Sequence, residues 1–387
     1  MLNFTYAVST KVFFGKGTID CLNLEIEKYT DKLLLVYGGG SVKKNGIYET
    51  LVRILDKSDI EYVELSGVQP NPLIDSVRKG IQLCKDQDLD FILGVGGGSV
   101  IDCAKTIAAG MYYEGDPWDL FVLGDSAIRD ALPIGTVLTF AGTGSEMNGN
   151  AVISNKETEQ KLAIHSDFLR PRFSILDPTY TFTVPKEQTA AGTVDIFSHV
   201  LEQYFSPTKE AFLQDRLSES ILKTCIKYGP IALDEPTNYD ARAQLMWASS
   251  LALNGFLGYG RVTDWATHGI EHAVSAMYDV IHGVGLAILT PKWMKYVLDE
   301  ETLEKFAKYA SNVWSIQGKN ERETAEDGIE KTQEFFANLG MPIRLRDVGV
   351  KEERLVDMAA KTVLYGTVGK LKKLGKNDVL AILKNAY

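Results

Sequence analysis

Two short apolar runs in the first quarter of the chain each lead directly into three glycines and a serine. Lys32–Tyr37 precedes Gly38-Gly39-Gly40-Ser41, and Phe91–Val95 precedes Gly96-Gly97-Gly98-Ser99. Short apolar runs bounded by turn residues are typical of buried strands, and glycines permit a tight turn from such a strand into a helix. The repeated pattern predicts parallel β-α-β units.

The spacing of apolar residues in the rest of the chain differs between its two halves. Ile47–Asp56 and Asp75–Lys85 have helical spacing, and we expect a third strand at Ala131–Leu138. After Val184, long helical periodicity with few strand-like runs continues to the last residue, with breaks expected at prolines such as Pro230 and Pro291. A chain of 387 residues exceeds the usual size of one core. We therefore expect an α/β domain over residues 1–183 and an all-α domain over residues 184–387.

Composition excludes several classes of partner. The net charge of −10 argues against nucleic acid or an anionic membrane surface as the main partner. No apolar run approaches the roughly 20 residues that span a bilayer, and the first residues lack a basic segment followed by an apolar one, so we expect a cytoplasmic protein. The four cysteines form no Cys-x-x-Cys pair, so any metal must be held by other residues.

The turn Gly96-Gly97-Gly98-Ser99 is the phosphate-binding candidate. It follows an expected strand and precedes an expected helix, so backbone N–H groups at a helix N-terminus could receive a pyrophosphate. The alternative is that the glycines only permit a tight turn. The turn does not match Gly-x-Gly-x-x-Gly, because the sixth position is Ile101. The class of ligand therefore needs support from other residues.

The first turn bears on the choice of cofactor. Many dinucleotide folds place an acidic residue after the first strand, where it binds the adenosine ribose hydroxyl. Gly38, Gly39 and Ser41 offer no carboxylate, and Lys43 and Lys44 follow, so a ribose 2′-phosphate is tolerated. This favours NADP over NAD, although a solvated surface charge is the better interpretation of Lys44.

A third cluster of small and hydroxyl residues, Thr139–Glu146, follows the third expected strand. The hydroxyls of Thr139 and Thr143 could contact phosphates or the nicotinamide amide. The alternative is that Ser145 and Glu146 only cap and open a helix. We assign Glu146 no catalytic role.

Four of the five histidines, together with an aspartate, form the clearest chemical signal. Asp195 and His199 stand four residues apart in a helical stretch, so both side chains leave one face. His268 and His272 have the same spacing, and His282 precedes another apolar helix. One carboxylate and three imidazoles from Asp195, His199, His268 and His282 would suit Fe(II) or Zn(II).

The order His268-x-x-Glu271-His272 also resembles an inverted zinc-protease motif. We reject that interpretation because it leaves the glycine turns and the Asp195/His199 pair without a purpose. His272 then becomes a candidate proton relay near the metal, and a purely structural histidine is an almost equal alternative.

Taken together, these motifs resemble the iron-containing (group III) alcohol dehydrogenases, in particular their butanol dehydrogenase branch. The resemblance spans nearly the whole chain and rests on motifs in the same order: Phe13-Phe14-Gly15, Tyr37–Asn45, Pro70-Asn71-Pro72, Gly96–Lys105, Gly142–Glu146, Asp177-Pro178, Gly192–His199 and Gly269–Gly285. It implies a Rossmann-like N-terminal domain, a helical C-terminal domain of the dehydroquinate synthase-like fold, and a cleft holding cofactor and metal.

The resemblance also implies roles for individual residues. Asp195, His199, His268 and His282 match the family's metal ligands. Gly96 to Ser99 would hold the pyrophosphate, with Asp102, Thr139 and Lys161 nearby, and Asn71 joins the cofactor residues. We expect an NADP(H)-linked enzyme, with NAD less favoured, that interconverts short-chain alcohols and aldehydes such as butanol and butanal and forms a homodimer. A metal lyase is the alternative, but it would need a pocket rich in Lys and Arg, whereas the helical stretch bearing His268 carries Trp265, Ala266, Ile270 and Ala273.

Overall fold

The computed structural model describes all 387 residues and divides the chain into two compact units. The α/β unit comprises Ala7–Val184 and Pro236–Asn254, and the helical unit comprises Met1–Tyr6, Pro185–Glu235 and Gly255–Tyr387. The division after Val184 lies one residue beyond the expected end of the first domain. The expected single boundary is nevertheless incomplete, because two short segments belong to the unit of the other half.

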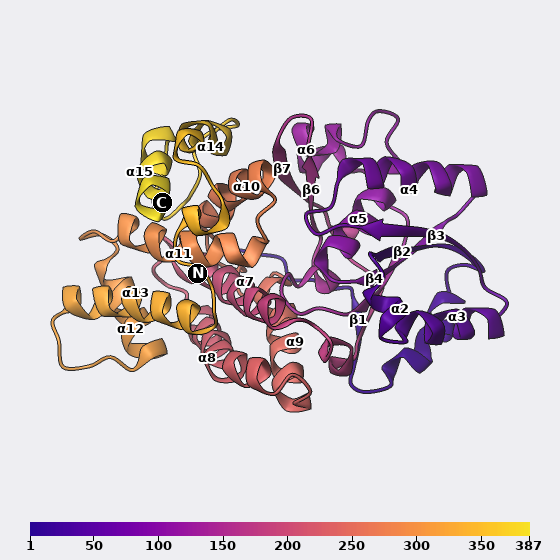
Figure 1. The fold of residues 1–387 in the computed structure, drawn as a ribbon, viewed down its shortest axis with the longest axis horizontal. Coiled ribbons are helices and arrows are strands. Elements are labelled where there is room, and N and C mark those ends of the chain that lie inside the picture. The colour runs from indigo at the N-terminus through magenta and orange to yellow at the C-terminus, as the bar shows by residue number, and fades with distance from the viewer. The chain divides into compact units, whose positions relative to one another are not determined.

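The α/β unit is built on a six-stranded sheet in the order β1-β8-β5-β4-β2-β3, in which every pairing is parallel. Figure 1 draws β1 to β4 in indigo and purple. The six strands are β1 (Lys11–Phe14), β2 (Lys32–Gly38), β3 (Glu61–Val68), β4 (Phe91–Gly96), β5 (Ile134–Leu138) and β8 (Phe173–Leu176). A separate antiparallel hairpin consists of β6 (Asn150–Asn155) and β7 (Gln160–His165).

The third expected strand is shorter than the sequence suggested. β5 begins at Ile134, not at Ala131. Pro133 has no N–H to donate, and the N–H of Ala131 is bound by the side chain of Asp130 at 2.8 Å. These two residues therefore cannot extend the ladder.

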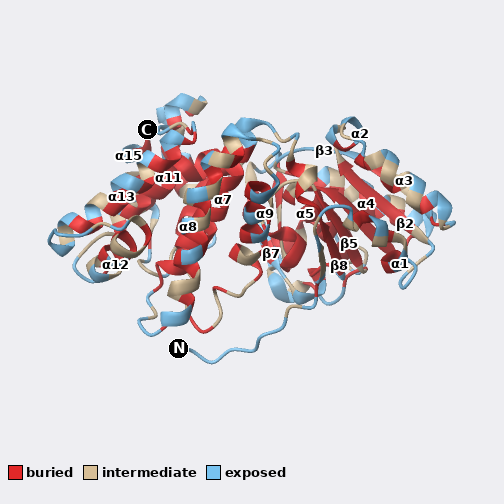
Figure 2. Cartoon of the chain, turned by 90° about the horizontal axis from the view of Figure 1, so that it is seen from below, coloured by how far each residue is buried: buried red, intermediate tan, exposed pale blue.

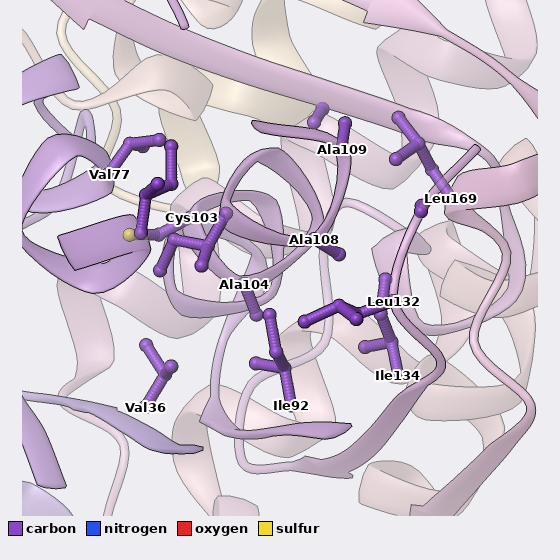
Figure 3. Close-up of a cluster of buried hydrophobic side chains, with 14 of the residues drawn as sticks. Val36, Val77, Ile92, Cys103, Ala104, Ala108, Ala109, Leu132, Ile134 and Leu169 are labelled. Carbon is purple, nitrogen blue, oxygen red and sulfur yellow. The ribbon is translucent and has the colours of Figure 1, made fainter. Parts of the chain in front are cut away.

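Alternate residues of the strands pack on opposite faces of the sheet, as the period of two requires. On one face, residues such as Leu34 and Ile92 pack with the helices that follow β3 and β4; on the other, Leu33 and Leu93 pack with helices from the start of the chain. Figure 3 shows the first cluster, where Ile92 lies beneath Ala104. The helices of this unit are α1 (Leu22–Ile26), α2 (Ser41–Lys44), α3 (Ile47–Lys57), α4 (Ile74–Gln87), α5 (Gly98–Gly110), α6 (Asp119–Leu123) and α9 (Tyr239–Leu253).

The helical unit contains one helix that is buried along most of its length. α7 is buried continuously from Thr189 to Tyr204, and Figure 2 shows it almost entirely in red. Its polar residues must therefore find partners inside the protein. The helices of the unit are α7 (Lys186–Tyr204), α8 (Phe212–Asp234), α10 (Ala266–Tyr278), α11 (His282–Val297), α12 (Leu303–Trp314), α13 (Glu321–Asn338), α14 (Leu355–Thr362) and α15 (Lys376–Ala386).

Two expected helix breaks do not occur. α8 continues through Pro230 and α11 continues through Pro291. An internal proline costs a helix about 3 kcal/mol. Around Pro291, every residue from Gly283 to Pro291 is buried, so tertiary packing overrides the local preference. No helix of the protein is both long and apolar enough to cross a bilayer.

The segment Pro236–Asn254 comes from the second half of the sequence but belongs to the α/β unit, and its hydrogen bonds explain why. It carries α9, whose Ser249 hydroxyl accepts the N–H of Gly142 at 2.8 Å and whose Ser250 hydroxyl donates to the carboxylate of Glu146. Both partners lie in the loop after β5. α9 therefore completes the support of that loop although it is distant in sequence.

Candidate metal and nucleotide sites

Three helices of the helical unit bring the four predicted metal ligands together. Asp195 and His199 lie one turn apart on α7, with 3.4 Å between Asp195 Oδ1 and His199 Nδ1. His268 lies in the first turn of α10, and His282 is the first residue of α11, with its Nε2 3.6 Å from Asp195 Oδ1. One possible ligand atom from each of the four residues lies within 4.8 Å of all the others.

The surroundings of His268 fit a bound cation. Its Nε2 is buried and makes no hydrogen bond, while its other ring nitrogen, Nδ1, pairs with the carboxylate of Glu202. A buried polar atom without a partner costs about 1–3 kcal/mol. His268 belongs to the group that includes Asp195, His199 and His282. A carboxylate and three imidazoles can hold Fe(II) or Zn(II) at this point.

Two buried glutamates, to which the sequence analysis gave no role in supporting the ligands, pair with two of the imidazoles. Glu202 on α7 pairs with His268, and Glu271 on α10 pairs with His282; both carboxylates are fully buried. Burial lowers the pKa of His268, but the charge and hydrogen bond of Glu202 outweigh that effect and raise it. A signal existed in the sequence, because Glu202 stands three residues after His199 and Glu271 three residues after His268.

His272 lies beside the four-residue group. Its ring centroid is 5.7 Å from that of His282 and 6.5 Å from that of His268. The residue is partly exposed and can form an alternative group with Glu271 and His282. This position is compatible with a proton donor near the metal.

An indole also packs against the ligand rings. Trp265 precedes α10 in a left-handed conformation, with φ of 77°. Its ring meets the edges of His199 and His268, at centroid distances of 6.1 and 5.3 Å, and its Nε1 donates to Thr263 at 2.8 Å. Such a backbone is uncommon for a large residue. Asp264, before it, accepts the N–H of Ala266 at 2.9 Å and so supports the start of α10.

In the α/β unit, the second glycine turn stands between β4 and α5. Gly96 ends β4, and α5 begins at Gly98. A Cβ atom on Gly98 would lie 2.4 Å from Thr143, and one on Gly96 would lie 2.6 Å from Val100. Close packing thus requires these glycines, and the same turn presents the N-terminus of a 13-residue helix.

The turn also contacts the other predicted nucleotide residues. The N–H of Thr139 donates to the carbonyl of Gly96 at 3.0 Å, and Thr143 lies against Gly98. Gly38 ends β2 beside Val100 of α5, so the first turn lies next to the second. The structure therefore brings Gly38, Gly39 and Ser41 to the same edge of the sheet as Gly96 to Ser99.

Asp102, which we expect near the pyrophosphate, lies on α5 and bonds the loop after β5 and the hairpin. Its buried carboxylate accepts the hydroxyl of Ser145 at 2.6 Å and the N–H of Val152 at 3.0 Å. It therefore steadies the loop after β5 and the hairpin. Burial raises the pKa of Asp102, and the nearby charges of Lys105 and Lys161 oppose that rise.

Lys105, one turn further along α5, was missed by the sequence interpretation. It is fully buried, and its Nζ donates to Ser145 Oγ, Asn148 Oδ1 and the carbonyl of Asn150 at 2.9, 3.0 and 2.8 Å. Burial lowers the pKa of Lys105 to about 7. A lysine within an apolar helical stretch, Val100–Ala109, is the signal that could have identified it.

Lys161 is buried rather than an ordinary surface lysine. It is 7% exposed, and its Nζ donates to Asn71 Oδ1 at 2.9 Å. Asn71 adopts a positive φ of 52° between its two prolines. The two residues that only the family resemblance suggested therefore form one pair, and Lys161 lies near enough to Asp102 to affect its pKa.

Lys43, after the first turn, is not simply solvated. Its Nζ lies over the rings of Tyr48 and Tyr37, and 3.9 Å from the carboxylate of Glu64 on β3. Glu64 also accepts the hydroxyls of both tyrosines. β2 carries no carboxylate at its end, but the neighbouring strand β3 brings that of Glu64 close to Tyr37.

Comparison with known proteins covers the whole chain. A model of the family "Iron-containing alcohol dehydrogenase" matches residues 9–178, and one of the family's C-terminal region matches residues 189–387. The chain is 53% identical to NADH-dependent butanol dehydrogenase A of Clostridium acetobutylicum, covering 100% of both chains. It is 41% identical to the NADPH-dependent aldehyde reductase YqhD of Escherichia coli, covering 99% of this chain and 97% of that one.

Solved structures agree with the fold. The structure of an NADH-dependent butanol dehydrogenase A from Thermotoga maritima superposes with a TM-score of 0.95 at 41% identity, covering 100% of this chain and 99% of that one. The α/β unit followed by a helical unit is therefore the architecture of that protein as well.

Proposed function

We propose that this chain, which belongs to the iron-containing alcohol dehydrogenase family and is an NAD(P)-dependent alcohol dehydrogenase, interconverts short-chain aliphatic aldehydes and alcohols such as butanal and butanol. The convergence of Asp195, His199, His268 and His282 is the observation that carries the proposal. Relatives named butanol dehydrogenase and aldehyde reductase support the substrate class.

Asp195, His199, His268 and His282 would hold Fe(II) or Zn(II). A divalent ion supplies Lewis acidity, which polarises a carbonyl as negative charge develops on its oxygen. The helices supply the rest: they place one negative and three neutral donors around one point, and they bury that point, so the donors require little rearrangement. The Trp265 indole excludes water from the side of His199 and His268 that it covers.

The glycine turn of the α/β unit would bind the cofactor's pyrophosphate. Gly96, Gly97, Gly98 and Ser99 offer backbone N–H groups at the start of α5, and Thr139 and Thr143 place hydroxyl groups beside the turn. Asp102 holds the adjoining loop in place through Ser145. Lys161 and Asn71 form the polar pair at the hairpin, where Lys161 offers a positive charge to the cofactor.

His272 would deliver the proton to the alkoxide that hydride transfer produces. Its ring stands beside His282 and is partly exposed, so it can exchange protons with solvent. Positioned general acids of this kind contribute about 10²- to 10⁴-fold to the rate.

We further propose that the first turn accepts NADPH in addition to NADH. Gly38, Gly39 and Ser41 place no carboxylate where a 2′-phosphate would lie, and Lys43, whose ammonium group also faces Glu64, follows the turn. The relative from Clostridium acetobutylicum is named for NADH and that from Escherichia coli for NADPH, so the named relatives use either cofactor.

The test is turnover with defined metal and cofactor. Protein loaded with Fe(II) under anaerobic conditions, or with Zn(II), is mixed with butanal and either NADPH or NADH, and loss of absorbance at the reduced nicotinamide band is followed. We expect turnover with at least one metal and none in Asp195→Ala. Metal-loaded protein that oxidises neither cofactor with butanal would contradict the proposed reaction, and a tenfold or larger preference for NADH would contradict the cofactor proposal.

A further inference from the structure

Two of the three imidazoles at the metal site are held from behind by buried carboxylates. Nδ1 of His268 pairs with Glu202, and Nδ1 of His282 pairs with Glu271. Both glutamates have side chains with no exposed surface. Burying a carboxylate destabilises the folded protein unless the group is strongly hydrogen-bonded. The two pairs with the imidazoles supply such bonds.

These pairs leave the opposite nitrogen, Nε2, of each ring available to a metal. Nε2 of His268 is buried with no hydrogen-bond partner, and Nε2 of His282 lies 3.6 Å from Asp195 Oδ1. An ionised carboxylate can accept a hydrogen bond from an N–H group at Nδ1, but it has no proton to donate to that nitrogen. Each glutamate therefore selects the ring form that carries its proton on Nδ1 and leaves a lone pair on Nε2.

Each carboxylate is itself held in place. Glu202 accepts the backbone N–H groups of Thr267 and His268 at 2.5 and 3.3 Å, at the start of α10. Glu271 accepts the hydroxyl of Ser275. Gly285 on α11 makes room for this side chain, because a Cβ atom there would lie 2.7 Å from Glu271 Cγ. Neither carboxylate can turn away without losing these bonds.

We propose that Glu202 and Glu271 are positioning residues for the metal: each orients one ligating imidazole through Nδ1, presents its Nε2 to the ion, and increases the donor strength of that nitrogen. The inference rests on the proposed function only for the identity of the site. Groups that hydrogen-bond a metal ligand without touching the metal contribute about 10- to 100-fold to metal affinity in other proteins.

The experiment measures the metal directly. Glu271→Gln keeps the size of the side chain and an oxygen acceptor but removes the charge, and Glu202→Gln does the same behind His268. Glu219→Gln is the matched control, because Glu219 is a buried carboxylate of the same unit that bonds Tyr204, Arg216 and Asn312. The dissociation constant for Zn(II) is determined for the full chain by competition with a chromogenic chelator.

We expect Zn(II) affinity to fall about 10- to 100-fold in Glu271→Gln and in Glu202→Gln, and to stay within about twofold of wild type in Glu219→Gln. Wild-type affinity in both site variants, or an equal loss in the control, would overturn the proposal. Should the Glu variants fail to fold, Ser275→Ala removes only the hydroxyl that holds Glu271, and we expect a smaller loss in the same direction.

A second measurement reads the ring form itself. In Zn(II)-loaded wild-type protein labelled with ¹⁵N-histidine, we expect the proton on Nδ1 and the metal on Nε2 of both His268 and His282. Zn(II) bound through Nδ1 of either ring would overturn the proposal. Neither measurement depends on turnover, so failure to reduce butanal would reject the proposed reaction and leave this result standing.

Discussion

Replacing Lys105 by methionine tests how the loop beside the phosphate-binding turn is supported. Lys105 is fully buried on α5, and its ammonium group bonds Ser145, Asn148 and the Asn150 carbonyl. Methionine has a similar length and no charge, so it preserves most of the packing and removes the titrating group.

The expected effect is a change in how stability depends on pH. Burial lowers the pKa of Lys105 in the folded protein to about 7, against 10.5 in an exposed lysine. Between these values the unfolded chain binds a proton that the folded chain has lost, so wild-type stability rises with pH across this window. The slope for one group is about 1.4 kcal/mol per pH unit, or about 2.5 kcal/mol over two units inside the window.

Below pH 7 both states bind the proton, and the full cost of burying the charge remains. The absolute effect of Lys105→Met is then the balance of two terms: relief of that cost, and loss of three hydrogen bonds beside the buried Asp102. The way stability changes with pH depends only on the protonation of Lys105. The difference between the pH dependences of wild type and Lys105→Met is therefore easier to interpret than the difference in stability at one pH.

Hydrogen exchange by mass spectrometry provides the assay. The opening free energy of the slowest α5 amides, in Gly98–Gly110, is measured at pH 7, 8 and 9 and corrected for the intrinsic exchange rate. Lys57→Met on α3, an exposed lysine, serves as the matched control and should follow the wild type. Opening free energies of wild type and Lys105→Met that stay parallel from pH 7 to pH 9 would refute the argument.

Three further predictions concern the site. His268→Ala removes the imidazole that pairs with Glu202 and so removes one metal donor. Bound metal, measured by elemental analysis, should fall well below one ion per chain, and kcat should drop by about a thousandfold or more; full metal content would contradict the ligand assignment. His272→Asn should lower kcat about 10²- to 10⁴-fold in steady-state assays while metal content stays at the wild-type level, and an unchanged kcat would exclude the proton-donor role. Gly39→Asp introduces a carboxylate after β2, so the ratio of kcat/KM for NADPH to that for NADH should fall about tenfold or more through repulsion of the 2′-phosphate; an unchanged ratio would mean that this turn does not contact the ribose.

Much of the fold could be predicted from local pattern. Lys32–Tyr37 and Phe91–Val95 are continuous apolar runs because both faces of a parallel strand are covered, and the structure confirms them as β2 and β4. β1 and β8 were missed because each has only four residues, and β3 because its side chains are mostly exposed or half-buried. Short or partly exposed strands carry little periodicity, so only tertiary pairing identifies them.

At the metal site too, local pattern predicts some of the residues and only the tertiary structure identifies the others. The spacing of Asp195 and His199 is a local property of one helix, and it was sufficient to predict a shared face. Glu202 and Lys105 received no role from local pattern, because charged residues usually indicate a solvated surface, and Glu271 entered only as part of the rejected zinc-protease motif. Their importance comes from burial, which depends on how α7 and α5 are enclosed by elements distant in sequence.

Each half of the proposed chemistry is assembled inside one unit. Asp195, His199, His268, His282 and the two carboxylates behind them all belong to the helical unit, whereas Gly96 to Ser99, Asp102 and Thr143 all belong to the α/β unit. The hydrogen bonds that orient the ligands, such as that between Glu202 and His268, stay within the helical unit, and those that support the loop beside the turn, such as Ser145 to Asp102, stay within the α/β unit. Substitutions behind the imidazoles should therefore change metal affinity without altering the backbone of the turn, because neither set of bonds uses an atom of the other.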